Sequence, residues 1–184
     1  MIIYSTRHGQ TEYNKNDIIL GTTDIELNET GLAQADELAE KVAQLKEIDI
    51  IIASPMKRAQ RTAQAVAEKT GLEIITDSRL REWDYGDYEA KTRYTEGFAQ
   101  SKTEFGVKMG KTGESLLQLS HRVYSAIDDI IAKYSDKTVL LVSHGGVCRV
   151  IETYFNDMST EKYSNWFMGN CELLKYDTET GGVL

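Results

Sequence analysis

The feature that most restricts the possible folds is a repeated pattern: a short apolar run ends at a polar turn, and a helical pattern follows. The clearest runs cover residues 2–6, 48–53 and 138–143, and weaker ones cover 73–77 and 171–177. Near-continuous apolar runs rich in β-branched residues are typical of strands buried on both faces. Such strands, separated by helices, predict an α/β fold: a three-layer α/β/α sandwich with a mostly parallel central sheet.

Capping residues and helical spacing of apolar residues predict the helices between these strands. Asn28 is a good N-cap for the first helix. Ser54 is expected to cap the second helix, with Pro55 in its first turn and Gly71 at its end. The expected helices cover residues 28–45, 54–71, 116–134 and 145–155.

Composition limits the classes of partner. The chain has 184 residues, 41% of them hydrophobic and 27% charged, which is ordinary for one globular domain, and we expect a single domain over residues 1–184. Its 21 Lys and Arg against 29 Asp and Glu give a net charge of −8, which argues against nucleic acid and anionic membranes as partners. An anionic ligand must therefore meet a local basic pocket.

The early charge at Arg7 and the few cysteines bear on location. The N-terminal apolar run is too short for a signal segment, and no stretch approaches the ~20 apolar residues of a membrane span. We therefore expect a cytoplasmic protein, monomeric or homodimeric. Cys148 and Cys171 are expected to be reduced core thiols.

One segment, residues 88–115, differs in composition from the rest of the chain. It has four glycines, few aliphatic residues, and five basic against four acidic side chains. A loop that covers an anion-binding site would have this composition, and so would a solvent-exposed loop without a function.

Residues suited to phosphate follow the predicted strands. Ligands of an α/β sheet bind beyond the carboxyl ends of its strands. Arg7 and His8 follow the first strand, Arg58 comes shortly after the second, and His144 follows the run at 138–143. Guanidinium groups match phosphate oxygens, and the free amides of a helix starting at Gly145 favour an anion. Together these residues predict a site for a phosphoryl group.

Displacement at phosphorus needs a nucleophile and a proton donor. A neutral imidazole can be the first and a carboxylic acid the second. Glu82 is the candidate acid, because it follows the weak strand at 73–77 and has aromatic neighbours that would desolvate it. His8, His144 and Glu82 could instead form a metal site. We rank that lower, because the neighbouring guanidinium groups would repel a divalent cation.

Five motifs occur in a fixed order along the chain. They are Arg7-His8-Gly9-x-Thr11-x-x-Asn14, Gly21-x-Thr23-Asp24-x-x-Leu27-x-x-x-Gly31-x-x-Gln34-Ala35, Ser54-Pro55-x-x-Arg58-Ala59-x-x-Thr62-Ala63, Leu80-x-Glu82-x-x-x-Gly86-x-x-Glu89 and Ser143-His144-Gly145-Gly146. Each motif alone is weak, but the ordered set is specific. The set resembles the histidine phosphatase superfamily, in its phosphoglycerate mutase-like branch.

The resemblance implies an α/β/α fold and a phosphohistidine intermediate formed without a metal ion or an organic cofactor. His8 would be the nucleophile and Glu82 the proton donor. Arg7, Arg58 and His144, the last as an imidazolium, would surround the phosphoryl group.

Other residues are expected to bind the rest of the substrate. The resemblance implies Asn14 as an accessory phosphate ligand. We expect Gln10, Thr23 and Tyr85, with the segment 88–115, to set specificity for a small phosphorylated metabolite. Sugar phosphates, nucleotides and phosphoacids all fit the residue types in these positions.

The resemblance leaves more than one activity open. The family's mutases carry a longer insertion between the glutamate and second histidine motifs, with a Lys and paired arginines; this chain has a short stretch there and no Arg-Arg pair. Tyr85 stands where mutases have tyrosine and many phosphatases phenylalanine, and Glu89-Ala90 departs from the usual Glu-Gly. We predict a metal-independent phosphomonoesterase similar to the broad-specificity or α-ribazole-phosphate phosphatases. The alternatives are a cofactor-dependent phosphoglycerate mutase and a non-catalytic phosphate-binding module.

Overall fold

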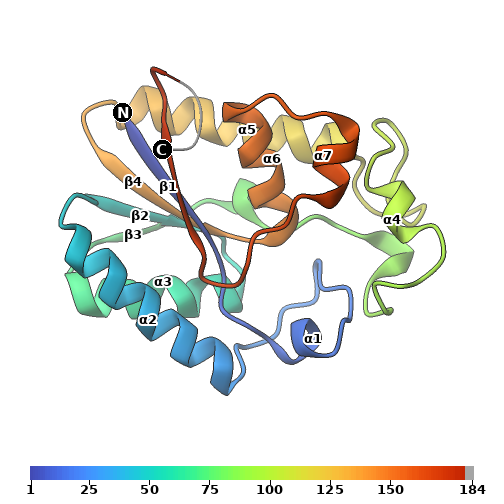
Figure 1. Ribbon diagram of the computed structural model, residues 1–184, viewed down its shortest axis with the longest axis horizontal. Coiled ribbons are helices and arrows are strands. Elements are labelled where there is room, and N and C mark those ends of the chain that lie inside the picture. The colour runs from blue at the N-terminus through green and yellow to red at the C-terminus, as the bar shows by residue number, and fades with distance from the viewer. Residues whose placement is uncertain (181–184) are drawn as a thin grey trace.

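A five-stranded sheet forms the centre of the computed structural model, which describes residues 1–180 (Figure 1). The strand order is β3-β2-β4-β1-β5; the first four strands in this order are parallel, and β5 is antiparallel to β1. The strands are β1 (Ile2–Arg7), β2 (Ile50–Ala53), β3 (Ile74–Thr76), β4 (Thr138–Ser143) and β5 (Leu173–Asp177).

Helices cover both faces of the sheet (Figure 1). The helices on one face are α2 (Glu29–Leu45) and α3 (Lys57–Thr70), and those on the other are α5 (Leu116–Lys133) and α6 (Gly145–Phe155). The shorter elements are α1 (Glu12–Lys15), α4 (Phe98–Ser101), α7 (Thr160–Asn165) and the 3-10 turns η1 (Ser78–Leu80) and η2 (Gly86–Tyr88). The predicted three-layer α/β/α architecture is confirmed.

Two hydrophobic cores, one on each face of the sheet, explain the near-continuous apolar strands. In β1, Ile3 belongs to the core under α5 and α6, whereas Tyr4 belongs to the core under α2 and α3. In β4, Leu141 and Leu140 divide between the two cores in the same way. Because side chains alternate along a strand, a strand covered on both faces needs apolar residues at successive positions.

The start of α3 differs from the prediction. Met56 occupies its N-cap position without a side-chain capping bond, so Pro55 lies before the helix and Ser54 is not its cap. The Ser54 hydroxyl is instead hydrogen-bonded to His144 Nε2 at 2.7 Å. The end of the helix is as predicted, because Gly71 adopts a left-handed conformation with φ of 75°.

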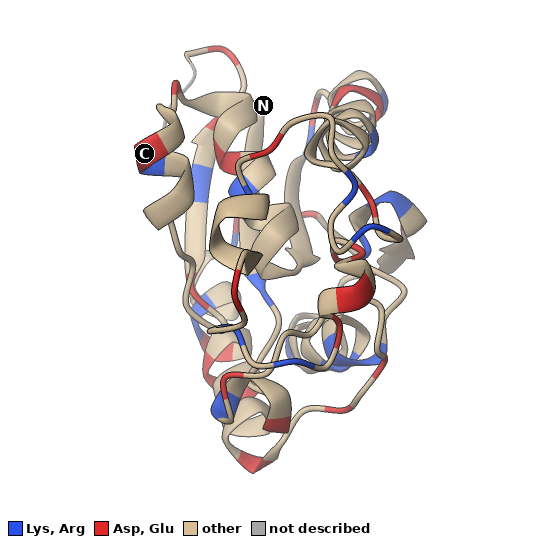
Figure 2. Cartoon of the chain, turned by 90° about the vertical axis from the view of Figure 1, so that its right-hand side faces the viewer, with Lys and Arg blue, Asp and Glu red and all other residues tan. Residues whose placement is uncertain are grey.

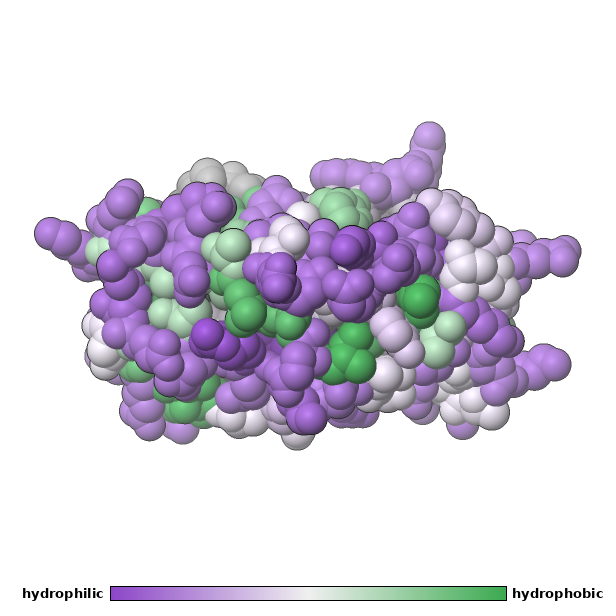
Figure 3. Space-filling view, turned by 90° about the horizontal axis from the view of Figure 1, so that it is seen from below, coloured by the Kyte–Doolittle hydropathy of each residue, from purple (hydrophilic) through white to green (hydrophobic). Residues whose placement is uncertain are grey.

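One face of the molecule and the two cysteines can be compared directly with the expectations from the sequence. The face seen from below, over α2 and α3, is mostly hydrophilic with scattered hydrophobic residues (Figure 3). Cys148 and Cys171 are buried free thiols, as predicted. Within residues 1–180 no helix has the length and apolar character needed to cross a membrane.

Candidate active site

Strand register brings the two predicted histidines together. In the parallel β1–β4 pair, Arg7 lies opposite Ser143, and the next residue of each strand is a histidine. The His8 amide donates to the Ser143 carbonyl at 3.0 Å. The rings of His8 and His144 lie with their centroids 5.2 Å apart, at a cavity of about 240 Å³ that His8 lines. The carboxyl ends of the strands therefore form the site, as the α/β prediction required.

The hydrogen bond of His8 fixes its tautomer. Nδ1 lies 2.7 Å from the Gly9 carbonyl oxygen. Because a carbonyl can only accept, Nδ1 carries the proton, and Nε2 is left with its lone pair. Burial, followed by the charges of Arg58 and Arg7, lowers the pKa of His8 well below its usual value. The ring is therefore neutral near pH 7, which is the form that can act as a nucleophile.

His144 is the opposite tautomer. Its Nδ1 accepts a hydrogen bond from Arg58 Nε at 3.2 Å, so Nε2 carries the proton and donates it to Ser54 Oγ. Burial, with the charge of Arg58 next in size, lowers the pKa of His144 well below its usual value. Without a bound anion these surroundings favour the neutral imidazole, so the imidazolium expected around a phosphoryl group stays a prediction for the bound state. Protonation of the ring would require an anion beside it.

Arg58 lies behind His144 and outside the cavity lining. Its side chain is fully buried, and Nη1 and Nη2 donate to the backbone carbonyls of Thr23 and Gly21, each at 2.8 Å. With Nε on His144, all three nitrogens have protein partners. The expected direct contact of Arg58 with a phosphoryl group is thus not preformed, because its donors hold the loop at Gly21 and Thr23.

Arg7 faces the cavity at the first turn of α6. Its Nη1 donates to the Met168 carbonyl at 3.1 Å, and its guanidinium lies over the Phe167 ring. Its Nε is a buried donor with no hydrogen-bond partner among the residues described. A side chain at Gly145 would contact Nε at 3.6 Å, so Arg7 lies beside the helix N-terminus. An acceptor from a bound anion would satisfy this donor.

Glu82 lines the same cavity and is held by two backbone amides. Its Oε1 accepts from the Trp83 amide at 2.8 Å, and its Oε2 accepts from the Gly146 amide at 3.2 Å. A Cβ atom at position 146 would lie 2.7 Å from Glu82 Oε1, so the carboxylate position requires glycine there. The buried carboxylate therefore has a fixed position near His8 and Arg7 in the cavity wall.

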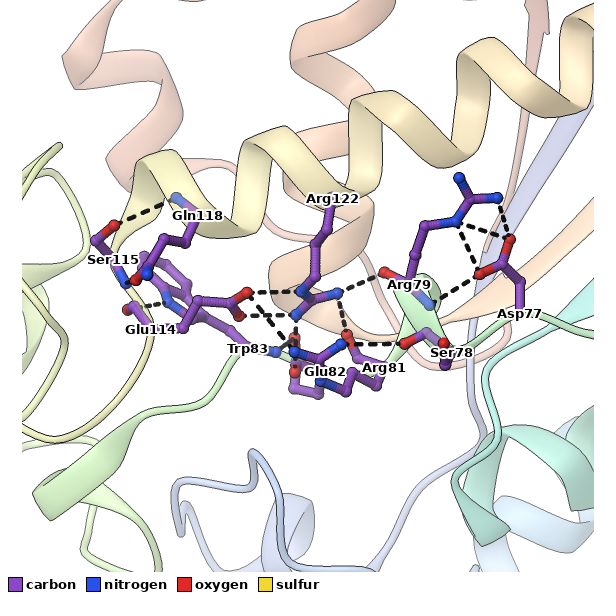
Figure 4. Close-up of polar contacts among 10 residues, drawn as sticks. All are labelled: Asp77, Ser78, Arg79, Arg81, Glu82, Trp83, Glu114, Ser115, Gln118 and Arg122. Carbon is purple, nitrogen blue, oxygen red and sulfur yellow. Dashed lines mark hydrogen bonds and ion pairs between the residues drawn. The ribbon is translucent and has the colours of Figure 1, made fainter.

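Arg122 of α5 anchors the loop that carries Glu82 (Figure 4). Its guanidinium donates to the backbone carbonyls of Arg79, Arg81 and Glu82. It also donates to both carboxylate oxygens of Glu114, at 2.7 and 2.9 Å. One side chain thus joins α5, the Glu82 loop and the end of the 88–115 segment.

The four predicted substrate residues that are not glycine separate into two pairs. Asn14 and Tyr85 line the cavity. Gln10 and Thr23 are not in its lining: Gln10 Oε1 accepts from Asn28 Nδ2 at 3.0 Å, and Thr23 contributes a backbone carbonyl to Arg58. The structure therefore does not place Gln10 and Thr23 at the cavity: Gln10 is hydrogen-bonded to the residue that caps α2, Thr23 to Arg58, and their contact with substrate stays a prediction.

Five cavity residues were not predicted individually, although two of them, Arg93 and Lys102, belong to the basic segment 88–115 that was expected to set specificity. Arg93, Lys102 and Arg149 line the cavity, and so do Phe167 and Met168. Arg149 lies four residues after Gly145 on α6, and this spacing places both on one helix face and could have identified it. The other four come from loops or short helices whose position no periodicity indicates.

The cavity lining is strongly basic. Four cationic side chains, Arg7, Arg93, Lys102 and Arg149, line it with one carboxylate, Glu82. Figure 2 views the end of the molecule near α4 and shows Lys and Arg on several loops and helices that meet there. This local excess, in a chain of net charge −8, favours an anionic ligand.

The alternative metal site lacks geometric support. Among residues 1–180, no three or more His, Cys, Asp or Glu side chains are grouped so that they could hold a metal ion, and this includes the set His8, Glu82 and His144. Three of the four imidazole nitrogens of His8 and His144 already have hydrogen-bond partners, namely Gly9, Arg58 and Ser54.

The fold and the site define an α/β protein with an anion-binding cavity built on paired histidines. The family model of the histidine phosphatase superfamily (branch 1) matches residues 3–184. The chain belongs to this superfamily, which confirms the predicted family.

Known relatives include both phosphatases and mutases. The chain is 30% identical over 183 residues to the putative phosphoserine phosphatase 2 of Hydrogenobacter thermophilus, covering 96% of this chain and 89% of the relative. It is 38% identical over 150 residues to the probable phosphoglycerate mutase GpmB of Enterobacter sp., covering 78% and 69%. The structure of a phosphoserine phosphatase from Entamoeba histolytica, in complex with 3-phosphoglyceric acid, superposes with a TM-score of 0.86 at 28% identity, covering 100% and 93%. The relatives that are named as phosphatases support the predicted hydrolase activity.

Proposed function

We propose that the protein is a metal-independent phosphomonoesterase that hydrolyses a small phosphorylated metabolite through a phosphohistidine on His8. The observation that carries this proposal is the Nδ1–Gly9 hydrogen bond, which leaves the Nε2 lone pair of a neutral His8 in a basic cavity. A nucleophile with that electronic form beside unsatisfied cationic donors suits attack on a phosphate ester.

In the first step, His8 Nε2 attacks phosphorus. The P–N bond forms while the ester P–O bond breaks, and Glu82 in its acid form gives its proton to the departing alcohol oxygen. Arg7 and the amide of Gly145 stabilise the phosphoryl oxygens from one side of the cavity. Asn14 acts as an accessory ligand, and Tyr85 forms part of the wall.

In the second step, Glu82 acts as a carboxylate. It takes a proton from water as the water oxygen attacks phosphorus, and the P–N bond breaks to release phosphate and restore His8. The two backbone amides that hold Glu82 keep the same carboxyl group in place for both steps.

His144 and Arg58 respond to the dianion. A phosphoryl group beside His144 raises the pKa of its ring by Coulombic attraction, and protonation at Nδ1 converts this atom from an acceptor to a donor. The hydrogen bond from Arg58 Nε to Nδ1 is then lost, so both cations can turn to the phosphoryl oxygens.

We also propose that residues 1–184 form one domain in which the segment 88–115 covers the substrate. This segment contributes Arg93, Tyr94, Phe98 and Lys102 to the cavity wall. The net charge of −8 supports an enzyme without nucleic-acid or anionic-membrane partners, for which we propose a cytoplasmic location.

The test is turnover of p-nitrophenyl phosphate with and without a chelator. We expect chelator-resistant phosphate release and an acid-labile phosphoenzyme, both abolished in His8→Ala. Chelator-sensitive release would favour the metal site, and turnover by His8→Ala would refute the nucleophile. Phosphoglycerate mutase is the second candidate, since Tyr85 lines the cavity. A mutase would isomerise phosphoglycerate faster than it releases phosphate.

A further inference from the structure

Part of the cavity lining is cationic but has no role in the proposed reaction. Arg93, Lys102 and Arg149 come from the loop before α4, the residue after α4, and α6. Arg93 is paired with Asp17 at 3.0 Å. In the described part of the chain, neither Lys102 nor Arg149 forms an ion pair. Two cations thus face a cavity without a carboxylate partner.

Lys102 is held in unfavourable surroundings for a cation. The side chain is half-buried, and Nζ lies over the ring of the buried Phe98, 5.2 Å from its centroid. Burial, with the charges of Arg149 and Arg93, lowers the pKa of Lys102 to about 8. An anion in the cavity would offset both the lost hydration and the repulsion among these cations.

Arg149 is fixed by the backbone rather than by an acid. Its Nε and Nη2 donate to the Trp166 carbonyl at 3.2 and 2.9 Å, and its guanidinium lies over the Tyr163 ring. Neither partner neutralises its charge. The guanidinium is therefore oriented in advance, with its charge available to a ligand.

We propose that Lys102 and Arg149 form a subsite for a second anionic group, so that the substrate is a phosphate ester that also carries a carboxylate or another phosphate. This inference rests on the proposed function, because a phosphoryl group at His8 places the second anion in the same cavity. A substrate without a second charge would leave these two half-buried cations without an anionic partner.

Three esters with one three-carbon backbone test the subsite. In 3-phosphoglycerate the terminal group is a carboxylate, in glycerol 1,3-bisphosphate a phosphate, and in glycerol 3-phosphate a neutral hydroxymethyl group. The measurement is kcat/KM for each, halved for the bisphosphate because its two phosphates are equivalent. We expect at least one doubly anionic ester to exceed glycerol 3-phosphate by about tenfold or more, as charge-assisted hydrogen bonds would give.

Variants assign this preference to residues. Lys102→Met and Arg149→Met should each reduce the preference by about tenfold while retaining turnover of glycerol 3-phosphate, which shows that they fold. Lys108→Met is the matched control: Lys108 is an exposed lysine of the same segment outside the cavity lining, and its substitution should leave the preference unchanged. The carboxylate and bisphosphate arms identify which anion the subsite takes.

Equal kcat/KM for all three esters, or a preference that survives in both variants, would overturn the subsite alone. No turnover of any ester or of p-nitrophenyl phosphate would overturn the proposed function. Calorimetric binding to the His8→Ala protein then decides the subsite without turnover. Tighter binding of a doubly anionic ester than of glycerol 3-phosphate supports it, and equal binding refutes it.

Discussion

Replacing Arg122 by Met would detach the Glu82 loop from α5. Arg122 holds three backbone carbonyls of that loop and both carboxylate oxygens of Glu114 (Figure 4). Methionine keeps an unbranched apolar stem but has no donors. The variant therefore removes the polar network while keeping much of the packing.

The magnitude follows from burial. The side chains of Arg122 and Glu114 are only 10% and 11% exposed. Removing one partner of a buried ion pair costs about 3–5 kcal/mol, because the other charge stays buried and unpaired. Arg81, 4.0 Å from Glu114, offsets part of this loss. We expect the free energy of unfolding to fall by about 3 kcal/mol, near the lower end of that range.

Urea unfolding followed by tryptophan fluorescence measures this loss, and phosphatase turnover reports the position of Glu82. The matched control is Arg81→Met in the same loop, whose side chain is 47% exposed and should cost less than about 1 kcal/mol. In Arg122→Met/Glu114→Met no unpaired carboxylate remains, so the double variant should recover roughly 1–2 kcal/mol relative to Arg122→Met.

Two results would refute this reasoning. One is an Arg122→Met protein as stable as Arg81→Met. The other is a double variant whose loss of unfolding free energy equals the sum of the losses in Arg122→Met and in Glu114→Met, since additivity would mean that Arg122 and Glu114 do not interact.

Three further predictions follow from the geometry. Gly146→Ala places a Cβ 2.7 Å from Glu82 Oε1 and should displace the carboxylate. We expect kcat to fall by at least about tenfold, with little change in the urea midpoint. An unchanged kcat would contradict the fixed position of Glu82. Because the folded-state pKa values of His8 and His144 are lowered, the unfolded chain binds more protons below pH 6.5, and stability should fall as pH decreases from 7 to 5. Urea titrations at several pH values should show that the unfolding free energy depends less steeply on pH in His8→Asn. An unchanged pH dependence would mean that groups other than His8 cause it. Ser54→Ala removes the acceptor of His144 Nε2–H and should cost about 1–3 kcal/mol of unfolding free energy. The control Ser135→Ala, at an exposed position, should cost almost nothing, and an equal loss in the two variants would contradict a stabilising role for the buried bond.

Local sequence features determined the architecture and most of the motif positions. The apolar runs that became β1 and β4, the Asn28 cap and the Gly71 stop depend on residue type and spacing along the chain, which are readable without tertiary contacts. The start of α3 was misplaced because Ser54 has a distant partner, His144, that competes with local capping.

The resemblance and the ends of the strands also indicated which residues gather at the site. The parallel register of Arg7 with Ser143 makes neighbours of His8 and His144, although they are far apart in the sequence. That neighbourhood follows from the general rule that parallel strands present their carboxyl ends at one edge.

Only the tertiary structure decided how the side chains are directed and protonated. It bonds Gly9 to one histidine and Arg58 to the other, which selects opposite tautomers. It also joins the Gln10 side chain to Asn28 by a hydrogen bond and brings Lys102 into the cavity wall. The physical reason is that hydrogen-bond partners, desolvation and charge repulsion act between residues that are close in space, and the order of residues along the chain does not specify those distances.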